Sequence, residues 1–415
     1  MRNRISYQNV GLLVGPSPAF SFHSGQNAED TSDGVGSSQK FVSSELKQLN
    51  LVQNASFNFS VPRSEIGQVG GTSLVARKAV SQPDISLGFT YILADGKNED
   101  MLGFNNEGQT SHFLSGQQNS SGDRNVFLIV SDHQQEDFNL QKSYKDHSVL
   151  SFGNCFPVSY SVEASVGSVA TASVEYLASN AKFDTASGTM SFTDSIGDVG
   201  VIGSGLIPAI DPTNGQPAST PEYGYILRSG DIMTATDDEK NMGHRNTGDI
   251  HYLRPGDMEL SFAESNIGGL KLSGSNRMHI TDISIEVPIE RTDLYGFGSK
   301  YVYDRRAMFP AVGNISFSAI ANNFNNGMTD DIFAEDQEYD FTITFMDPTS
   351  PVNSDGKPSN KAVELEVTKA ICQTQSFSIG MGGNMSVQGS FAFECSHRAG
   401  FKFSGVAGDY DSVWD

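Results

Sequence analysis

The residue types best suited to chemistry in this sequence are a few histidines and paired acids. His133 follows Asp132, and His244 comes shortly after Asp237 and Asp238. A helical zinc site needs two histidines four residues apart, and neither of these histidines has such a partner. We therefore interpret both histidines as surface residues in polar loops, and we expect no metal ion and no cofactor.

Two glycine-rich segments, residues 296–300 and 380–384, are the candidates for phosphate binding. A Walker loop has the pattern GxxxxGK[ST] between a strand and a helix, whereas here Lys300 is followed by Tyr301 and Val302. Both segments therefore predict turns that use the backbone freedom of glycine. The sequence also lacks a GxSxG nucleophile elbow. We expect no enzymatic activity, although a glycosidase needs only two acids brought together by folding.

A charged pair occurs twice, at the same place in two similar segments. Arg63 and Glu65 lie in FNFSVPRSEIGQVG, and Arg291 and Asp293 lie in ISIEVPIERTDLYGFG. The two segments match without a gap when Arg63 is aligned with Arg291, which we call the opening alignment. Each pair either decorates a turn or reaches a neighbouring subunit, where charge sets register more than affinity. These four residues are the candidate inter-subunit contacts.

The elements that must position these pairs are strands. Apolar residues alternate with other residues before each pair and again further along, and this period of two predicts half-buried strands. The alternating positions match in the opening alignment: Phe57, Phe59 and Val61 match Ile285, Val287 and Ile289, while Leu87, Phe89 and Tyr91 match Ile315, Phe317 and Ala319. The sequence therefore predicts one strand-and-loop unit that occurs twice.

Later strands match at a shorter separation. NVFLIVSD (residues 125–132) resembles YDFTITFMD (residues 339–347), and Cys155 matches Cys372. Each copy ends in two alternating stretches around a turn of small residues, which is the pattern of a β-hairpin. Between the second and third strands, NEDMLGF and TDDIFAED begin with helix N-cap patterns, so we expect a short helix in each copy.

This organisation predicts a mainly β fold of two tandem β-sandwich or barrel domains, each with a short flanking helix. We expect the first domain at residues 1–181 and the second at 248–396. The Pro, Gly, Thr and Asn content between them predicts a linker with exposed loops at 182–247. The remaining residues, 397–415, are expected to form a C-terminal tail that either frays or docks Trp414 on a neighbouring subunit.

Composition limits the classes of function. The formal net charge is −22 at pH 7, which argues against binding nucleic acid by neutralising phosphates. Acidity of this kind serves solubility, or a surface that must not hold a nearby polyanion. The three cysteines have no zinc-site spacing and predict a reduced protein made in a cytosol. Without a long apolar stretch or a signal-peptide core, we expect a soluble protein with no membrane partner.

The duplicated segments resemble the tail tube proteins, also called major tail proteins, of long-tailed bacteriophages, in the form with two fused copies. The resemblance rests on three pairs of stretches, and no single motif among them is diagnostic. The pairs are LVQNASFNFSVPRSEIGQVGG and ITDISIEVPIERTDLYGFGSK, ISLGFTY and ISFSAI, and NCFPVSYSVEASVGSVATASVEY and ICQTQSFSIGMGGNMSVQGSFAFEC.

The resemblance implies a structural virion protein of the tail, assembled in the host cytoplasm into stacked rings. It implies inner sheets joined into a barrel, whose lumen holds a tape-measure protein during assembly and conducts DNA during ejection. Three copies of a two-repeat chain would supply six similar positions, so a homotrimeric ring with pseudo-sixfold symmetry is implied, with a hexamer left open. Tail terminator and baseplate proteins are further implied partners.

Two other classes of function stay open at this point. One is another virion β-protein, such as a capsid decoration or baseplate component; a decoration protein would stay a small closed oligomer and need a capsid. A carbohydrate-binding or hydrolytic β-sandwich usually presents an aromatic platform, and the single tryptophan, Trp414, is a poor one. The internal repeat and the missing catalytic motifs favour the tube subunit.

Overall fold

The structure is a computed structural model of the 415-residue chain. It describes residues 10–16, 47–79, 84–105, 113–114, 124–130, 148–185, 205–208, 224–227, 258–262, 266–267, 270–271, 279–294, 304–320, 337–347, 351, 360–379, 384–395 and 400–405. Several predictions concern residues outside this set: His133, His244, the acids beside them, Trp414, the second helix, residues 296–300 and most of 380–384, and most of the linker.

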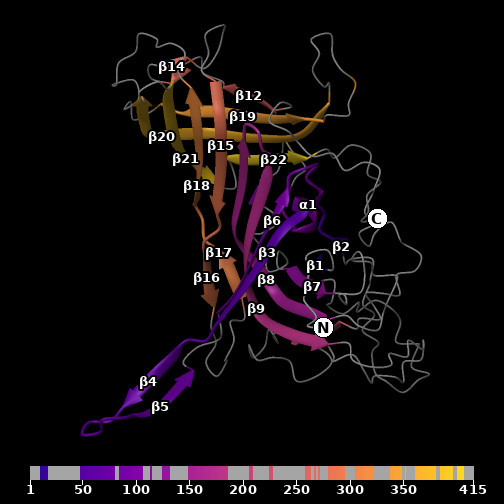
Figure 1. Cartoon of the computed structure of the whole chain (residues 1–415), viewed down its shortest axis with the longest axis vertical. Helices are drawn as coiled ribbons and strands as arrows, with labels where there is room; N and C mark the ends of the chain where they lie inside the picture. The colour runs from indigo at the N-terminus through magenta and orange to yellow at the C-terminus, as the bar shows by residue number, and fades with distance from the viewer. Residues whose placement is uncertain are drawn as a thin grey trace, which may run out of the picture.

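The described chain is mainly β, as predicted (Figure 1). Its helix is α1 (Lys97–Met101), which confirms the short helix expected in the first copy. The strands are β1 (Val10–Pro16), β2 (Lys47–Gln48), β3 (Val52–Ser60), β4 (Arg63–Gly67), β5 (Leu74–Ala79), β6 (Asp84–Ile92), β7 (Arg124–Val130), β8 (Ser148–Ser165), β9 (Thr171–Thr185), β10 (Gly205–Pro208), β11 (Gly224–Leu227), β12 (Met258–Phe262), β13 (Asn266–Ile267), β14 (Leu270–Lys271), β15 (His279–Pro288), β16 (Arg291–Leu294), β17 (Asp304–Ala307), β18 (Ala311–Ile320), β19 (Tyr339–Met346), β20 (Lys361–Ile379), β21 (Met385–Cys395) and β22 (Phe401–Gly405).

The central feature is a run of antiparallel strands that passes from the first half of the chain into the second. Its order is β3, β6, β9, β8, β15, β18, β21 and β20. We call these eight strands the inner sheet. Because side chains alternate between the two faces of a strand, the sheet has one apolar face and one polar face.

The two halves of the inner sheet repeat the same pairing. β3 pairs with β6 as β15 pairs with β18, and a bulge at Gln53 recurs at Thr281. The register of these opening strands therefore agrees with the opening alignment. The predicted closing hairpins are also present, as β8 with β9 and as β20 with β21.

The predicted match of Cys155 with Cys372 is wrong by two positions. The bulge at Val158 in β8 corresponds to the bulge at Gln373 in β20. We call the alignment that matches these two residues the closing alignment. The pairing of β7 with β8 recurs, in this same alignment, as the pairing of β19 with β20. Cys372 therefore corresponds to Pro157. A slip of two positions keeps every side chain on its own face, so the alternation of apolar residues could not detect it.

The apolar face of the inner sheet is covered by outer strands. β1, β7 and the first half of β8 form this layer in the first half of the chain, and β12, β19 and the first half of β20 form it in the second. Phe341 of β19 packs edge-on against Phe391 of β21, with ring centroids 5.0 Å apart. The two layers of each half enclose a close-packed aromatic core.

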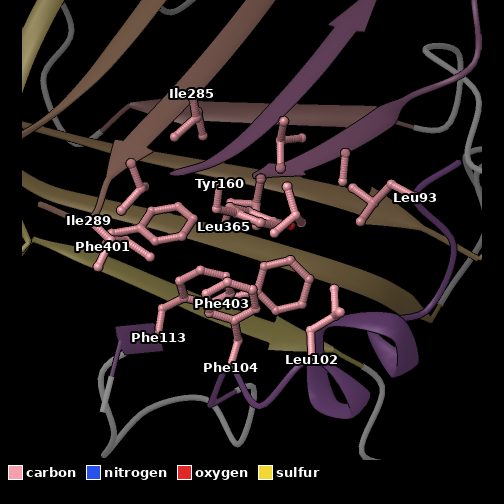
Figure 2. Close-up of a cluster of buried hydrophobic side chains, with 14 of the residues drawn as sticks. Leu93, Leu102, Phe104, Phe113, Tyr160, Ile285, Ile289, Leu365, Phe401 and Phe403 are labelled. Carbon is pink, nitrogen blue, oxygen red and sulfur yellow. The ribbon is translucent and has the colours of Figure 1, made fainter. Parts of the chain in front are cut away.

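The C-terminal region does not behave as the predicted tail over residues 401–405. These residues form β22, which pairs with the first half of β20 and takes the place that the last part of β9 holds beside β8. The fully buried Phe403 lies 5.5 Å from Phe113 and 6.4 Å from Tyr160, ring to ring (Figure 2). The last described strand thus belongs to a core that also contains residues from the first half of the chain.

Helix α1 begins differently from its predicted N-cap. The cap is Gly96 in a left-handed conformation, and the side chain of Asn98 instead accepts from the Asn50 N–H and donates to the Asn50 carbonyl. This arrangement places Glu99 in the core, where its Oε1 accepts hydrogen bonds from the Tyr91 and Tyr160 hydroxyls at 2.7 and 3.0 Å. All three cysteines are free thiols.

Candidate assembly interface

The two halves of the inner sheet meet where β8 pairs with β15. In this internal junction Tyr160 lies opposite Val287 and Val162 lies opposite Ile285, and all four side chains are buried. The alternation predicted from the sequence explains the result, because each of these residues points to the covered face. The internal junction therefore joins the two halves of the sheet through main-chain hydrogen bonds and apolar side chains.

The inner sheet ends at the two strands that correspond to the members of this junction. β3 corresponds to β15, and residues 371–379 of β20 correspond to the part of β8 that pairs with β15. Among the described strands, β3 pairs with β6 and this part of β20 pairs with β21, so each has one outer edge. Phe57 is 43% exposed and Phe377 is 46% exposed, whereas their counterparts Ile285 and Val162 are buried.

The predicted long loops after the opening strands contain two-stranded hairpins. β4 pairs with β5 and β16 pairs with β17 in the same register, so that Arg63 faces Ala79 as Arg291 faces Ala307. Each hairpin carries one ion pair across its strands: Glu65 with Arg77 at 2.7 Å, and Asp293 with Arg305 at 2.9 Å. The candidate residues Arg63, Glu65, Arg291 and Asp293 therefore sit at equivalent places on two equivalent hairpins.

The surroundings of the two hairpins differ sharply. Hairpin β16–β17 lies against the bulged part of β8: Arg291 Nε donates to the Pro157 carbonyl at 2.7 Å, and its guanidinium carbon lies 5.1 Å from the centre of the Phe156 ring. The same side chain also donates to the Arg305 carbonyl at 3.0 Å. Hairpin β4–β5 instead projects away from the rest of the described strands, and every residue of β4 is exposed (Figure 1).

The match between the two segments of the sequence identified only the acidic member of each ion pair. It singled out Arg63, Glu65 and their counterparts, but it missed Arg77 and Arg305, which complete the pairs. The signal was present, because ARKA at residues 76–79 and DRRA at residues 304–307 also match in the opening alignment. A cross-strand partner becomes visible only when the loop is recognised as a hairpin.

The polar face of the inner sheet is acidic. Glu286 lies opposite Ser161, Glu163 lies opposite Ser284, and Glu175 lies opposite Ser159, so these carboxylates share one face of the sheet. All three glutamates are exposed. The paired parts of the eight strands contain no lysine or arginine; these parts are residues 52–60, 84–92, 159–165, 171–178, 282–288, 311–320, 371–379 and 385–395. This surface repels polyanions.

The described residues contain neither a metal-binding cluster nor a membrane-spanning helix. No group of three or more His, Cys, Asp or Glu side chains there is arranged to hold a metal ion. No helix in the same part of the chain has the length and apolar character needed to cross a membrane.

Comparison with known proteins adds little to this geometry. No protein-family model matches the sequence, and no curated protein matches it. Among solved structures, the cryo-EM structure of the cap that terminates the tube of the anti-feeding prophage is similar to 39% of this chain and 99% of its own, with 11% sequence identity and a TM-score of 0.25. A TM-score this low carries no argument about fold or function.

Proposed function

We propose that this protein is a non-enzymatic structural subunit of a bacteriophage tail tube, in which copies join edge to edge into rings and the rings stack. The observation that carries the proposal is the internal junction between β8 and β15. The chain already contains one complete joint of this kind, and it presents the two matching halves of a second joint at opposite ends of its inner sheet.

The register of the joint between copies follows from the internal junction. Within the chain, Val162 lies opposite Ile285. Phe377 is the counterpart of Val162 in the closing alignment, and Phe57 is the counterpart of Ile285 in the opening alignment. The joint therefore places Phe377 of one copy opposite Phe57 of the next. The same register places Ile379, which is 76% exposed, opposite Ala55. Both contacts bury apolar surface that the single chain leaves in water.

An open sheet edge exposes unpaired N–H and C=O groups and invites uncontrolled association. Joining the β20 edge of each copy to the β3 edge of the next is a head-to-tail contact, which closes into a ring if the rotation per copy allows. Because each copy supplies two similar repeats, we propose that three copies close the ring with pseudo-sixfold symmetry. The closed ring has no free inner edge.

The acidic polar face gives such a ring a role as a conduit. If this face lines the lumen, then Glu163, Glu175 and Glu286 recur around it and prevent DNA from adhering as it passes. Under this proposal the tape-measure protein fills the same lumen during assembly, and tail terminator and baseplate proteins meet the ends of the tube. The protein would then be part of the virion tail, assembled in the host cytoplasm.

Electron microscopy and native mass spectrometry of the purified full-length chain test the proposal. The expected result is hollow rings or tubes, with a smallest ring of three copies. A protein that stays monomeric at all accessible concentrations contradicts the proposal, and so does a closed oligomer whose β3 and β20 edges exchange amide hydrogens as fast as in the monomer. Binding of glycans by such a monomer would favour the carbohydrate-binding alternative.

A further inference from the structure

The two hairpins form a matched pair in different surroundings. They share register and ion pair, but the side chain of Arg305 is 4% exposed whereas that of Arg77 is 62% exposed. The two hairpins differ in exposure because β16–β17 lies beside the bulged part of β8. The bulged part of β20 corresponds to the bulged part of β8. It lies at the opposite end of the inner sheet from β3, the strand that leads into hairpin β4–β5.

We propose that hairpin β4–β5 docks on residues 371–373 of β20 in a second copy of this chain, with Arg63 as its anchor. The inference rests on the edge-to-edge association proposed above and adds the side-chain contact that orients it. The docking face of the hairpin consists of Arg63, Glu65 and Arg77, which lie on one side of the ribbon because residues directly opposite each other share a face.

Each contact that Arg291 and the end of β15 make with β8 has an equivalent between the first half of one copy and β20 of the second copy. Arg291 Nε donates to the Pro157 carbonyl, so Arg63 Nε would donate to the carbonyl of Cys372 in the second copy. The Ile289 N–H donates to the Val158 carbonyl at 2.7 Å, so the Val61 N–H would donate to the carbonyl of Gln373.

One contact changes in kind between the two sites. The Arg291 guanidinium lies over the Phe156 ring, and the residue that corresponds to Phe156 in β20 is Ile371, which is 49% exposed. Arg63 would therefore cover an aliphatic side chain with the stem and plane of its own side chain. The contact removes Ile371 from water without a cation–π term.

The exposure of hairpin β4–β5 in the single chain favours a binding partner for it. A two-stranded ribbon without a third strand or a covering layer is marginally stable in water. The ion pair between Glu65 and Arg77 is exposed and contributes little while the hairpin stands alone. Docking would bury this pair, as Arg305 is buried in the second hairpin, and would make the main-chain carbonyl of Cys372 an acceptor for a charged donor.

The test separates the hairpin contact from the strand joint. Cysteines introduced at positions 57 and 377, in a Cys372→Ser background, report the strand joint by forming a disulfide between copies, because directly opposed strand residues have suitable Cα spacing. Hydrogen exchange of the β4–β5 amides reports the hairpin. Arg63→Ala removes the anchor, and Lys78→Ala removes one positive charge from the other face of the same hairpin as a matched control.

We expect the β4–β5 amides to exchange more slowly in rings than in monomers, for both the parent protein and Lys78→Ala. With Arg63→Ala the disulfide still forms, but the hairpin loses its protection. In protein without the introduced cysteines, Arg63→Ala raises the dissociation constant of the ring about tenfold or more. A disulfide that forms while the hairpin exchanges as fast in rings as in monomers overturns this inference and leaves the proposed function intact. Absence of both disulfide and rings overturns both.

Discussion

Val287 lies directly opposite Tyr160 where β15, in the second half of the chain, pairs with β8, in the first half, and both side chains are buried. This pairing is the contact within the chain on which the proposed joint between copies is based. The residues at the two outer edges of the inner sheet, on β3 and β20, correspond in register to the residues that form this contact.

Replacing Phe377 by Asp is expected to prevent ring formation while the monomer stays folded. The side chain is 46% exposed in the chain, but between copies it would face Phe57 in an apolar contact, where an unpaired carboxylate is costly. Sedimentation velocity gives the assembly state, and circular dichroism reports the fold.

Val312→Asp is the matched control for this substitution. Val312 is 55% exposed on β18, in the interior of the inner sheet, so the variant adds the same charge without touching either edge. Rings of the usual size from Phe377→Asp, or equal losses from both variants, would contradict the edge-to-edge joint.

Replacing Glu163, Glu175 and Glu286 together by lysine is expected to make the protein bind DNA. The parent face carries these acids without a basic residue, so the triple change turns a repulsive surface into one that neutralises phosphates. Fluorescence anisotropy with labelled DNA should show binding that weakens steeply with salt. The triple glutamine variant is the control, since it removes charge without adding a cation, and strong binding by it would refute the electrostatic explanation.

Replacing Phe403 by Ala is expected to lower the free energy of unfolding by about 3–5 kcal/mol, because a fully buried phenylalanine leaves a cavity. Phe403 packs against Phe113 and Tyr160, so the loss would show that the C-terminal strand stabilises the first half of the chain (Figure 2). Urea denaturation measures the effect. Lys402→Ala, on the same strand, removes a partly exposed ion pair with Glu366 and should cost at most about 1 kcal/mol.

The parts of this fold that were predictable from sequence are those with a strong period of two. Leu87, Phe89 and Tyr91 are buried as their alternation predicts, and so are their counterparts in β18. Phe57 and Phe59 show the same alternation and remain more than one third exposed, because alternation reveals that a face is apolar but not whether the same chain covers it.

The hairpins and β22 were not predictable in the same way. Strand β4 is short and fully exposed, and β5 is short and mostly exposed, so neither buries an apolar face that a period of two would reveal. Phe401 and Phe403 lie in a strand of five residues that is separate from β21 along the chain. Their burial depends on β20, which is adjacent in space but distant along the chain.

Glu99 makes the stability of the fold depend on pH. It is fully buried, and this burial raises the pKa of its carboxyl from 4.5 to about 7, against the opposing effect of the hydrogen bonds from Tyr91 and Tyr160. The folded state therefore holds the proton more tightly than the unfolded state. The resulting stabilisation is complete below the unfolded pKa of 4.5 and is lost as the pH rises through about 7.

Glu99→Gln is expected to remove this dependence. The amide keeps an oxygen that accepts from both tyrosine hydroxyls and cannot ionise, so the variant should gain stability relative to the parent as the pH rises. The gain between about pH 5 and about pH 8 should be about 2–3 kcal/mol, from about 1.4 kcal/mol per pKa unit. Urea denaturation of both proteins in the Phe377→Asp background measures it without coupling to dissociation. A difference between parent and variant that stays constant over this range would show that Glu99 has the same pKa in both states.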